Sequence, residues 1–345
     1  MKALCDLLNN NSVLTAQDLW NHKVKSEAVH LTAAGEIELD EDEHTGYFET
    51  DVFDMVAFNE VVGTFNGYTY PMSALNLAIS MRIDHEMSAF FSYGDWGLGK
   101  LNVYYDQSDS HSHMCVDQIL VDDGLMADGV KIKVTLLRAD QALESPRLRQ
   151  VSLATKPNIT ELSAEAIAQL PKKVAYDVPK FNQNRVPVIG GEMCSATTSA
   201  MLVAYMGLRL DDRTYPHRAM AHLVADAGHH APTFGNWAYN IDAMGALGYN
   251  SSFIYSTLNG LKAILANVGP CGASIKGQTD YYHTNGHLIC VTGYEEREHG
   301  TVLFVNDPNV DDRFGKGLDV AIEMSEETFM RVWRNAIYTI ESSKK

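Results

Sequence analysis

Short runs of alternating apolar and polar residues fill the N-terminal half of the chain. Leu75–Arg82 and Val130–Val134 alternate with a period of two, which places successive side chains on opposite faces of a β-strand. Strand-like runs bounded by turn residues are Asp54–Val62, Asn76–Ile83, Met87–Tyr93, Leu101–Tyr105, Gln118–Val121 and Val130–Arg138. Strands at this spacing predict an all-β sandwich or jelly-roll-like domain over residues 46–155.

The pattern changes after Val178. Cys194–Tyr205 is rich in Ala and Met and is expected to form a helix that ends at Gly207. Further helices are expected over Tyr215–Ala227, Asn236–Leu247 and Thr257–Asn267, and two strand-like runs follow at Leu288–Tyr294 and Thr301–Val305. Helices first and strands later predict an α+β domain over residues 176–345.

Two other segments complete the expected organisation. Residues 1–45 are mixed and are interpreted as a lead segment, in which Val13–Val29 is expected to be a short helix with Thr15 as its N-cap. Residues 156–175 are interpreted as a connector, because prolines surround a short expected helix at Ser163–Leu170.

Composition and charge narrow the classes of function. The chain has 345 residues, with 27 Lys and Arg against 44 Asp and Glu, which gives a formal net charge of −17. Such a balance disfavours binding to nucleic acid or to an anionic membrane surface. No apolar run reaches the ~18 residues of a membrane span, and the N-terminal residues do not follow the pattern of a signal peptide. A cytoplasmic location is therefore expected.

The cysteines indicate a reducing compartment rather than a disulfide framework. They are five, widely spaced and without a CxxC pair: Cys5, Cys115, Cys194, Cys271 and Cys290. This spacing also lacks the ligand pattern of a zinc site, and no metal or organic cofactor is expected.

The segment Gly190–Met201 carries the clearest chemical signal. A glycine turn delivers Cys194 to the first turn of the expected helix. A helix N-terminus exposes free N–H groups and carries a partial positive charge, and both favour thiolate over thiol. Taken alone, the same pattern also fits a cysteine that is simply packed in the core.

A second segment supplies partners for that thiolate. Leu288–Tyr294 and Thr301–Val305 are expected to form a β-hairpin with a polar loop over Glu295–Gly300. Pairing Tyr294 with Thr301 brings His287 opposite Pro308 and beside Asp307, because opposed Cβ atoms in an antiparallel pair lie ~5 Å apart. A carboxylate next to an imidazole is what a Cys–His nucleophile requires.

Acyl transfer also requires groups that bind the oxyanion. The backbone N–H of Cys194 is one candidate, and the side chain of Gln183, eleven residues earlier, is another. Asn236 and Trp237 are expected to lie near the cleft. The pattern fits equally well if Trp237 is simply buried in the core.

The order Gln…Cys…His…Asp, in the motifs VPKFNQ, GGEMCSATTSAMLVAYMG, GHLICVTGY and VLFVNDP, resembles the C39-like cysteine peptidases of papain-like fold. Residues 234–275 resemble the segment that follows the catalytic helix in bacterial members, and the N-terminal half is similar to a β-rich domain that precedes some of these peptidases. The resemblance implies Cys194 as nucleophile, His287 as base, Asp307 as the residue that orients it and Gln183 as oxyanion donor. Ser195 departs from the family, which usually has glycine there.

The sequence thus predicts a cysteine peptidase or amidohydrolase acting on a peptide or protein. An acyl transferase of the transglutaminase type would use the same three residues and differ only in the second nucleophile. A catalytically inactive relative that binds carbohydrate or protein is the alternative that is not an enzyme. The sequence leaves the oligomeric state open.

Overall fold

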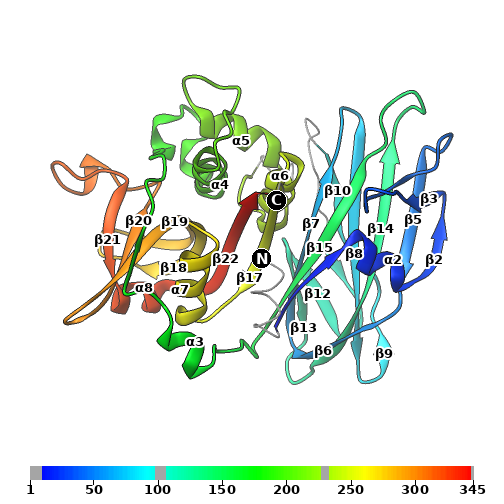
Figure 1. Cartoon of the computed structure of the whole chain (residues 1–345), viewed down its shortest axis with the longest axis horizontal. Coiled ribbons are helices and arrows are strands. Elements are labelled where there is room, and N and C mark those ends of the chain that lie inside the picture. The colour runs from blue at the N-terminus through cyan, green and yellow to red at the C-terminus, as the bar shows by residue number, and fades with distance from the viewer. Residues whose placement is uncertain (1–9, 98–105, 227–232, 343–345) are drawn as a thin grey trace.

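The structure is a computed structural model that describes residues 10–97, 106–226 and 233–342. It has an α+β architecture with a β-rich N-terminal part (Figure 1). The expected strand Leu101–Tyr105 and the residue Cys5 lie outside the described residues.

Two antiparallel sheets form the N-terminal part. The first has the order β11 (Gln107–Ser108), β12 (Ser112–Cys115), β13 (Gln118–Val121), β7 (Glu60–Tyr68), β15 (Arg147–Lys156), β4 (Ile37–Leu39) and β3 (Val29–Leu31), and β1 (Asn11–Thr15) also pairs with β15. The second has the order β10 (Phe91–Trp96), β8 (Ser73–Ile83), β14 (Ala127–Arg138), β5 (Thr45–Thr50) and β2 (Lys23–Glu27), with β6 (Phe53–Phe58) on β14 and β9 (Glu86–Met87) on β8.

The two sheets pack face to face on one apolar core. The ring of Phe65 in β7 meets the ring of Trp96 in β10 edge-on, with centroids 6.0 Å apart. Gly63 leaves room for a side chain of the opposite sheet, because a Cβ at this position would stand 2.4 Å from Cδ1 of Ile79.

The lead segment is part of these sheets rather than separate from them. Thr15 caps helix α2 (Ala16–Asn21), as expected, and Asp18 completes the capping box by accepting from the Thr15 N–H. The helix is much shorter than Val13–Val29, because residues 23–27 pair with β5 as a strand.

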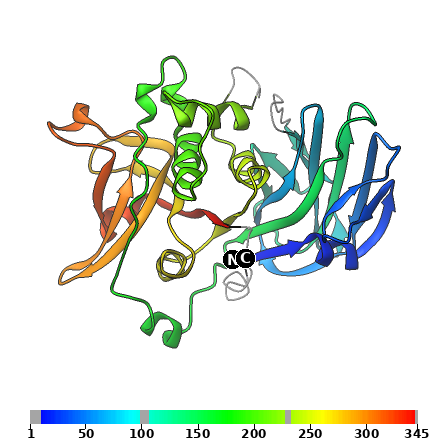
Figure 2. The ribbon, with the colours of Figure 1, turned by 45° about the horizontal axis from the view of Figure 1, so that its top comes forward.

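The C-terminal part is a third antiparallel sheet with helices on both faces (Figure 2). Its order is β17 (Tyr249–Tyr255), β22 (Trp333–Ser342), β18 (Cys271–Gln278), β19 (His283–Arg297), β20 (Gly300–Asn306) and β21 (Ala321–Ser325), and β16 (Lys173–Ala175) pairs with β19. The helices of the connector and this part are α3 (Ala164–Ala168), α4 (Cys194–Tyr205), α5 (Pro216–Val224), α6 (Trp237–Ala246), α7 (Leu258–Asn267) and α8 (Glu326–Val332). Each helix expected from residue 163 onward is present.

Alternation along β19 explains why both faces are covered. Leu288 and Cys290 belong to the core that includes α4 and α6, whereas Ile289 and Val291 belong to the core that includes α7 and α8. Every residue of this stretch is buried, which is the pattern of a strand enclosed on two sides.

The expected register of the β19–β20 hairpin is wrong by two positions. Thr301 pairs with Glu296 instead of Tyr294, and Tyr294 pairs with Leu303. The polar loop is only Glu298 and His299, because the strands continue pairing through Arg297 and Gly300. His287 therefore pairs with Ile275 of β18, and β20 ends at Asn306 before reaching it.

Helix α6 lies between the third sheet and the β-rich part (Figures 1 and 2). Its Asp242 carboxylate accepts the N–H of Phe65 in β7 over 2.9 Å. From the other direction, Arg149 of β15 donates to the carbonyl oxygens of Gly245 and Tyr249. Buried polar contacts therefore fix the two parts against each other.

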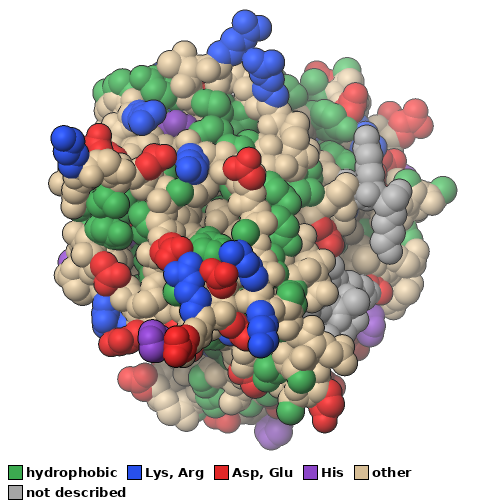
Figure 3. Space-filling model, turned by 60° about the vertical axis from the view of Figure 1, so that its left-hand side comes forward, with side chains coloured by type: hydrophobic (Ala, Val, Ile, Leu, Met, Phe, Trp, Pro, Cys, Tyr) green, Lys and Arg blue, Asp and Glu red, His purple; other side chains and the backbone are tan. Residues whose placement is uncertain are grey.

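The visible surface of the C-terminal part mixes charges of both signs. Figure 3 shows Lys and Arg side chains lying beside Asp and Glu side chains on this face. Arg297, for example, forms ion pairs with Glu295 and Glu323. Among the described residues, no helix combines the length and the apolar character that a membrane crossing requires.

Asp242 generates a prediction about stability. Burial raises the pKa of its carboxyl well above the usual range. An unfolded Asp ionises near ~3.9, so above that pH the unfolded state releases a proton that the folded state keeps, and stability falls as the pH rises. Asp242→Asn removes this loss, and its melting temperature is expected to exceed that of the wild type increasingly from mildly acidic to neutral pH.

Thermal unfolding over a pH series measures this difference, with Asp42→Asn, at an exposed position, as the matched control. A difference that does not change with pH, or a variant less stable than the wild type at neutral pH, would contradict the prediction.

Candidate active site

Cys194 is the first residue of α4 and follows a short 3-10 turn, Gly190–Glu192. No side chain caps the start of this helix, so its first N–H groups remain available beside the sulfur. Gly190 is required for the close approach of this turn to Gln183, because a Cβ at Gly190 would stand 2.4 Å from the Gln183 carbonyl oxygen. The thiol is partly exposed although the helix behind it is buried.

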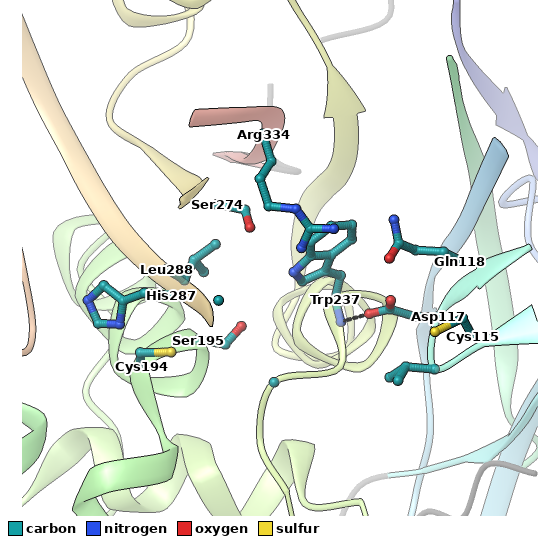
Figure 4. Close-up of a pocket in the computed structure, with 13 residues that line it drawn as sticks. Cys115, Asp117, Gln118, Cys194, Ser195, Trp237, Ser274, His287, Leu288 and Arg334 are labelled. Atoms are coloured by element: carbon teal, nitrogen blue, oxygen red, sulfur yellow. Dashed lines mark hydrogen bonds between the residues drawn. The ribbon is translucent and has the colours of Figure 1, made fainter. Parts of the chain in front are cut away.

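His287 and Asp307 come together at the end of the third sheet. His287 Nε2 lies 2.8 Å from Asp307 Oδ1, and both side chains are buried. A carboxylate only accepts hydrogen bonds, so Nε2 carries the proton of this contact. Nδ1 is then the nitrogen left for Cys194, which lies next to His287 at one side of the cavity in Figure 4.

Asp307 receives two further hydrogen bonds. The Tyr282 hydroxyl donates to Oδ2 over 2.6 Å, and the backbone N–H of Asn309 donates to Oδ1 over 2.9 Å. These donors fix the carboxylate in place although it is fully buried.

The electrostatics of the pair favour ionisation of both partners. Burial by itself raises the pKa of the Cys194 thiol, but attraction to His287, hydrogen bonding with its ring and nearby backbone N–H groups outweigh burial and lower the pKa. For His287, burial by itself lowers the pKa, but the charges of Asp307 and Cys194 outweigh it and raise the pKa. Both shifts favour a thiolate beside an imidazolium.

Gln183 lines a cavity beside the same thiol. Its backbone N–H donates to the Pro308 carbonyl over 2.9 Å, and its side-chain amide donates to the Gly191 carbonyl over 3.4 Å. Within the described residues, its buried Oε1 has no hydrogen-bond partner. Together with Cys194 and His287, Gln183 lines a cavity of about 320 Å³.

Trp237 and Asn236 have different positions. Trp237 lines a second cavity of about 260 Å³ that also reaches Cys194 and His287 (Figure 4). Asn236 is the N-cap of α6 and accepts the N–H of Tyr239 over 3.0 Å. Trp237 lines the second cavity but not the one beside Gln183, and Asn236 lines neither of them. The described part of the chain holds no group of three His, Cys, Asp or Glu side chains placed to bind a metal ion.

Comparison with known proteins identifies a family for this chain. Residues 175–340 match the Peptidase C39 like family, and residues 16–156 match the Peptidase C39 N-terminal domain. The chain belongs to the peptidase C39-like family. At the level of the family, the match supports a cysteine peptidase.

Other comparisons add little to this C39-like assignment. No curated protein matches the chain. Among solved structures, a family two carbohydrate esterase from Cellvibrio japonicus is similar at 10% identity and a TM-score of 0.21, over 45% of this chain and 36% of that one. The match thus spans about a third of the esterase, and a likeness this weak supports no conclusion about fold or activity.

Ser195, where C39-like members usually have glycine, lines the same cavity as Cys194 and Trp237 (Figure 4). Its side chain is buried, and its hydroxyl is hydrogen-bonded to the Tyr338 hydroxyl over 2.8 Å. The serine therefore ties the start of α4 to β22, which carries Tyr338.

Two residues of the C39-like site were not found from the sequence. Tyr282 donates to Asp307 from outside any motif. Asp117, in the turn between β12 and β13, accepts the N–H of Trp237 at the start of α6, and burial raises the pKa of its carboxyl to about 7. No local pattern marks either residue, because each acts on a partner that is distant in sequence or in another domain.

The lowered pKa of Cys194 predicts selective alkylation. Iodoacetamide at mildly acidic pH is expected to modify Cys194 before the other cysteines, because the thiolate is the reactive form and burial raises the pKa of Cys271 and Cys290. Peptide mapping over a time course measures the order of labelling. His287→Gln should shift the alkylation rate profile of Cys194 to higher pH. Uniform labelling, or earlier labelling of Cys115, would remove Cys194 as the activated thiol.

Proposed function

We propose that the chain is a cysteine peptidase or amidohydrolase, with Cys194, His287 and Asp307 as its triad in a papain-like domain that begins near residue 176. The contact between His287 Nε2 and Asp307 Oδ1, beside a thiol at a helix start, carries the proposal. The match of residues 175–340 to a peptidase family supports it, and a peptide or protein is the substrate class.

The first half of the reaction forms an acyl-enzyme. The Cys194 thiolate attacks the amide carbonyl carbon, and the carbonyl oxygen becomes an oxyanion. The His287 imidazolium then gives its proton to the leaving nitrogen as the C–N bond breaks. An amine departs and the acyl group stays on sulfur as a thioester.

The second half returns the enzyme to its starting state. Water attacks the thioester while His287 accepts the proton, and the C–S bond breaks to release a carboxylic acid and the Cys194 thiolate. Asp307 keeps the ring oriented and stabilises its charge throughout.

The oxyanion is bound by the Cys194 backbone N–H and the Gln183 side-chain amide. Gln183 suits this role because its backbone is tied to Pro308 and its amide reaches Gly191, three residues before the nucleophile. Donors that are fixed before the reaction stabilise developing charge without reorganisation.

Activity-based labelling tests the proposal. A peptidyl chloromethyl ketone should add one probe mass to the full chain, with the adduct on Cys194, and Cys194→Ser should abolish labelling and peptide cleavage. Cleavage in the presence of a primary amine separates hydrolysis from acyl transfer, which would yield an amide. A chain that is neither labelled nor active would be a binding module instead.

Asp307→Asn is expected to retain the fold and to lower peptide turnover by roughly 100-fold, the low end for loss of general acid–base assistance. The amide holds the ring less well and does not stabilise the imidazolium. Circular dichroism checks the fold, and Asp311→Asn is the matched control because Asp311 contacts Asn182 and Arg313 but not His287. Normal turnover of Asp307→Asn would exclude the triad.

Gln183→Ala is expected to lower turnover about 100- to 1,000-fold, as loss of one oxyanion donor does. Alkylation of Cys194 by iodoacetamide should stay nearly intact, because it develops no oxyanion. Asn184→Ala, in the same 3-10 turn, is the control, since its side chain contacts Asn309. If Gln183→Ala hydrolyses peptide at the normal rate, another group binds the oxyanion.

A further inference from the structure

The cavity on the Trp237 side of Cys194 is built by both domains. The turn between β12 and β13, residues 115–118, forms one wall, and Ser274 and Arg334 of the C-terminal domain form another (Figure 4). Asp117 anchors this wall, because it accepts the N–H of Trp237 at the start of α6. This hydrogen bond holds the turn against the start of α6.

Arg334 brings a cation to this cavity. Its guanidinium lies over the Trp237 ring, 4.6 Å from the centroid, and is partly exposed. Within the described residues, the Arg334 guanidinium donates no hydrogen bond to a carboxylate or carbonyl oxygen. It also has no carboxylate within 4.0 Å that would form an ion pair. Of the described residues that line the two cavities beside Cys194, Arg334 is the one Lys or Arg.

Val116 is the apolar residue of the turn at residues 115–118, which forms the wall of the cavity opposite Arg334. It sits in the two-residue turn between Cys115 and Gln118 with a φ of +60°, and its side chain is 41% exposed. Such a position favours glycine, and a β-branched residue there is strained. An exposed, strained valine that lines a cavity at the reacting thiol points to contact with a ligand.

We propose that this cavity is a substrate subsite for a carboxylate-bearing residue, in which Arg334 binds the carboxylate and Val116 and Trp237 contact its aliphatic stem. The inference rests on the proposed function and deepens it by naming the substrate class: peptides with Glu or Asp beside the scissile amide. The net charge of −17 repels acidic peptides at long range, so selection here comes from the local fit and not from steering.

Arg334 fits this role chemically. Its planar guanidinium offers paired donors to a carboxylate, and stacking on Trp237 orients those donors without using them. An acidic side chain of the substrate would give the guanidinium a carboxylate partner that the described residues do not supply by a hydrogen bond or an ion pair.

A pair of small reagents tests the subsite on the full chain. Iodoacetate and iodoacetamide alkylate the same thiol and differ mainly in charge. Arg334→Gln is expected to lower the iodoacetate-to-iodoacetamide rate ratio at Cys194 by about fivefold, the upper end for an accessible ion pair. Arg331→Gln is the matched control, because Arg331 is exposed and contacts Gln278 and Asp280; its ratio should equal that of the wild type.

A binding measurement separates failure of the subsite from failure of the proposed function. Two capped pentapeptides, with Glu or Gln between alanines, are titrated against Cys194→Ala. The Glu peptide should bind about fivefold more tightly, and the preference should vanish in Cys194→Ala with Arg334→Gln. Equal binding of both peptides, or an unchanged reagent ratio in Arg334→Gln, overturns the subsite. Absence of selective alkylation at Cys194 overturns the proposed function, and the pentapeptides still decide the subsite.

Discussion

The contact between His287 and the fully buried carboxylate of Asp307 is the interaction on which the rest of the site depends. Taking a carboxylate out of water is costly unless donors surround it. His287, the Tyr282 hydroxyl and the Asn309 N–H supply those donors. With the carboxylate held, the pKa of His287 rises, and the imidazolium in turn lowers the pKa of Cys194.

The thiol can meet the His287–Asp307 pair only if helix α4 is held firmly on the third sheet. Cys194 comes from a helix start, whereas His287 and Asp307 come from the end of a sheet. Packing of α4 against Leu288 and Cys290 fixes the helix on that sheet, and the side chains of Ser195 and Thr198 bond to Tyr338 and to the Leu288 carbonyl. The thiol is therefore positioned by buried contacts on either side of it.

The seam between the two domains completes the cleft. The start of α6 rests on Asp117 of the N-terminal domain, and Asp242 farther along the helix holds Phe65. The β-rich domain thus contributes to the cleft itself, because its turn at residues 115–118 lines a cavity together with Cys194. The proposed substrate subsite and the contact between the two parts of the chain therefore share Asp117 and Trp237.

Local signals were sufficient for part of this molecule. Thr15, Thr257 and Asn236 mark helix starts by their own side chains, and the glycine turn marks the start of α4 at Cys194. The hairpin register was wrong because the length of the turn, two residues, leaves no trace in the apolar pattern. His287 and Asp307 meet nonetheless, because the chain beyond Asn306 turns back toward β19.

Contacts between segments that are distant along the chain could not be predicted from the sequence. Tyr282, Asp117 and Arg334 become functional candidates only through tertiary packing. Residues 11–15 and 23–27 carry strand patterns too short to recognise alone, and their partners in β15 and β5 decide their structure.

Nitrogen NMR of the His287 imidazole tests the central claim most directly, because it reports the charge of the ring that links Asp307 to Cys194. The account predicts an imidazolium in the wild type at neutral pH, with protons on both ring nitrogens, and a lower His287 pKa in Cys194→Ala, which lacks the thiolate. A neutral ring at neutral pH whose titration is unchanged by Cys194→Ala would contradict the account.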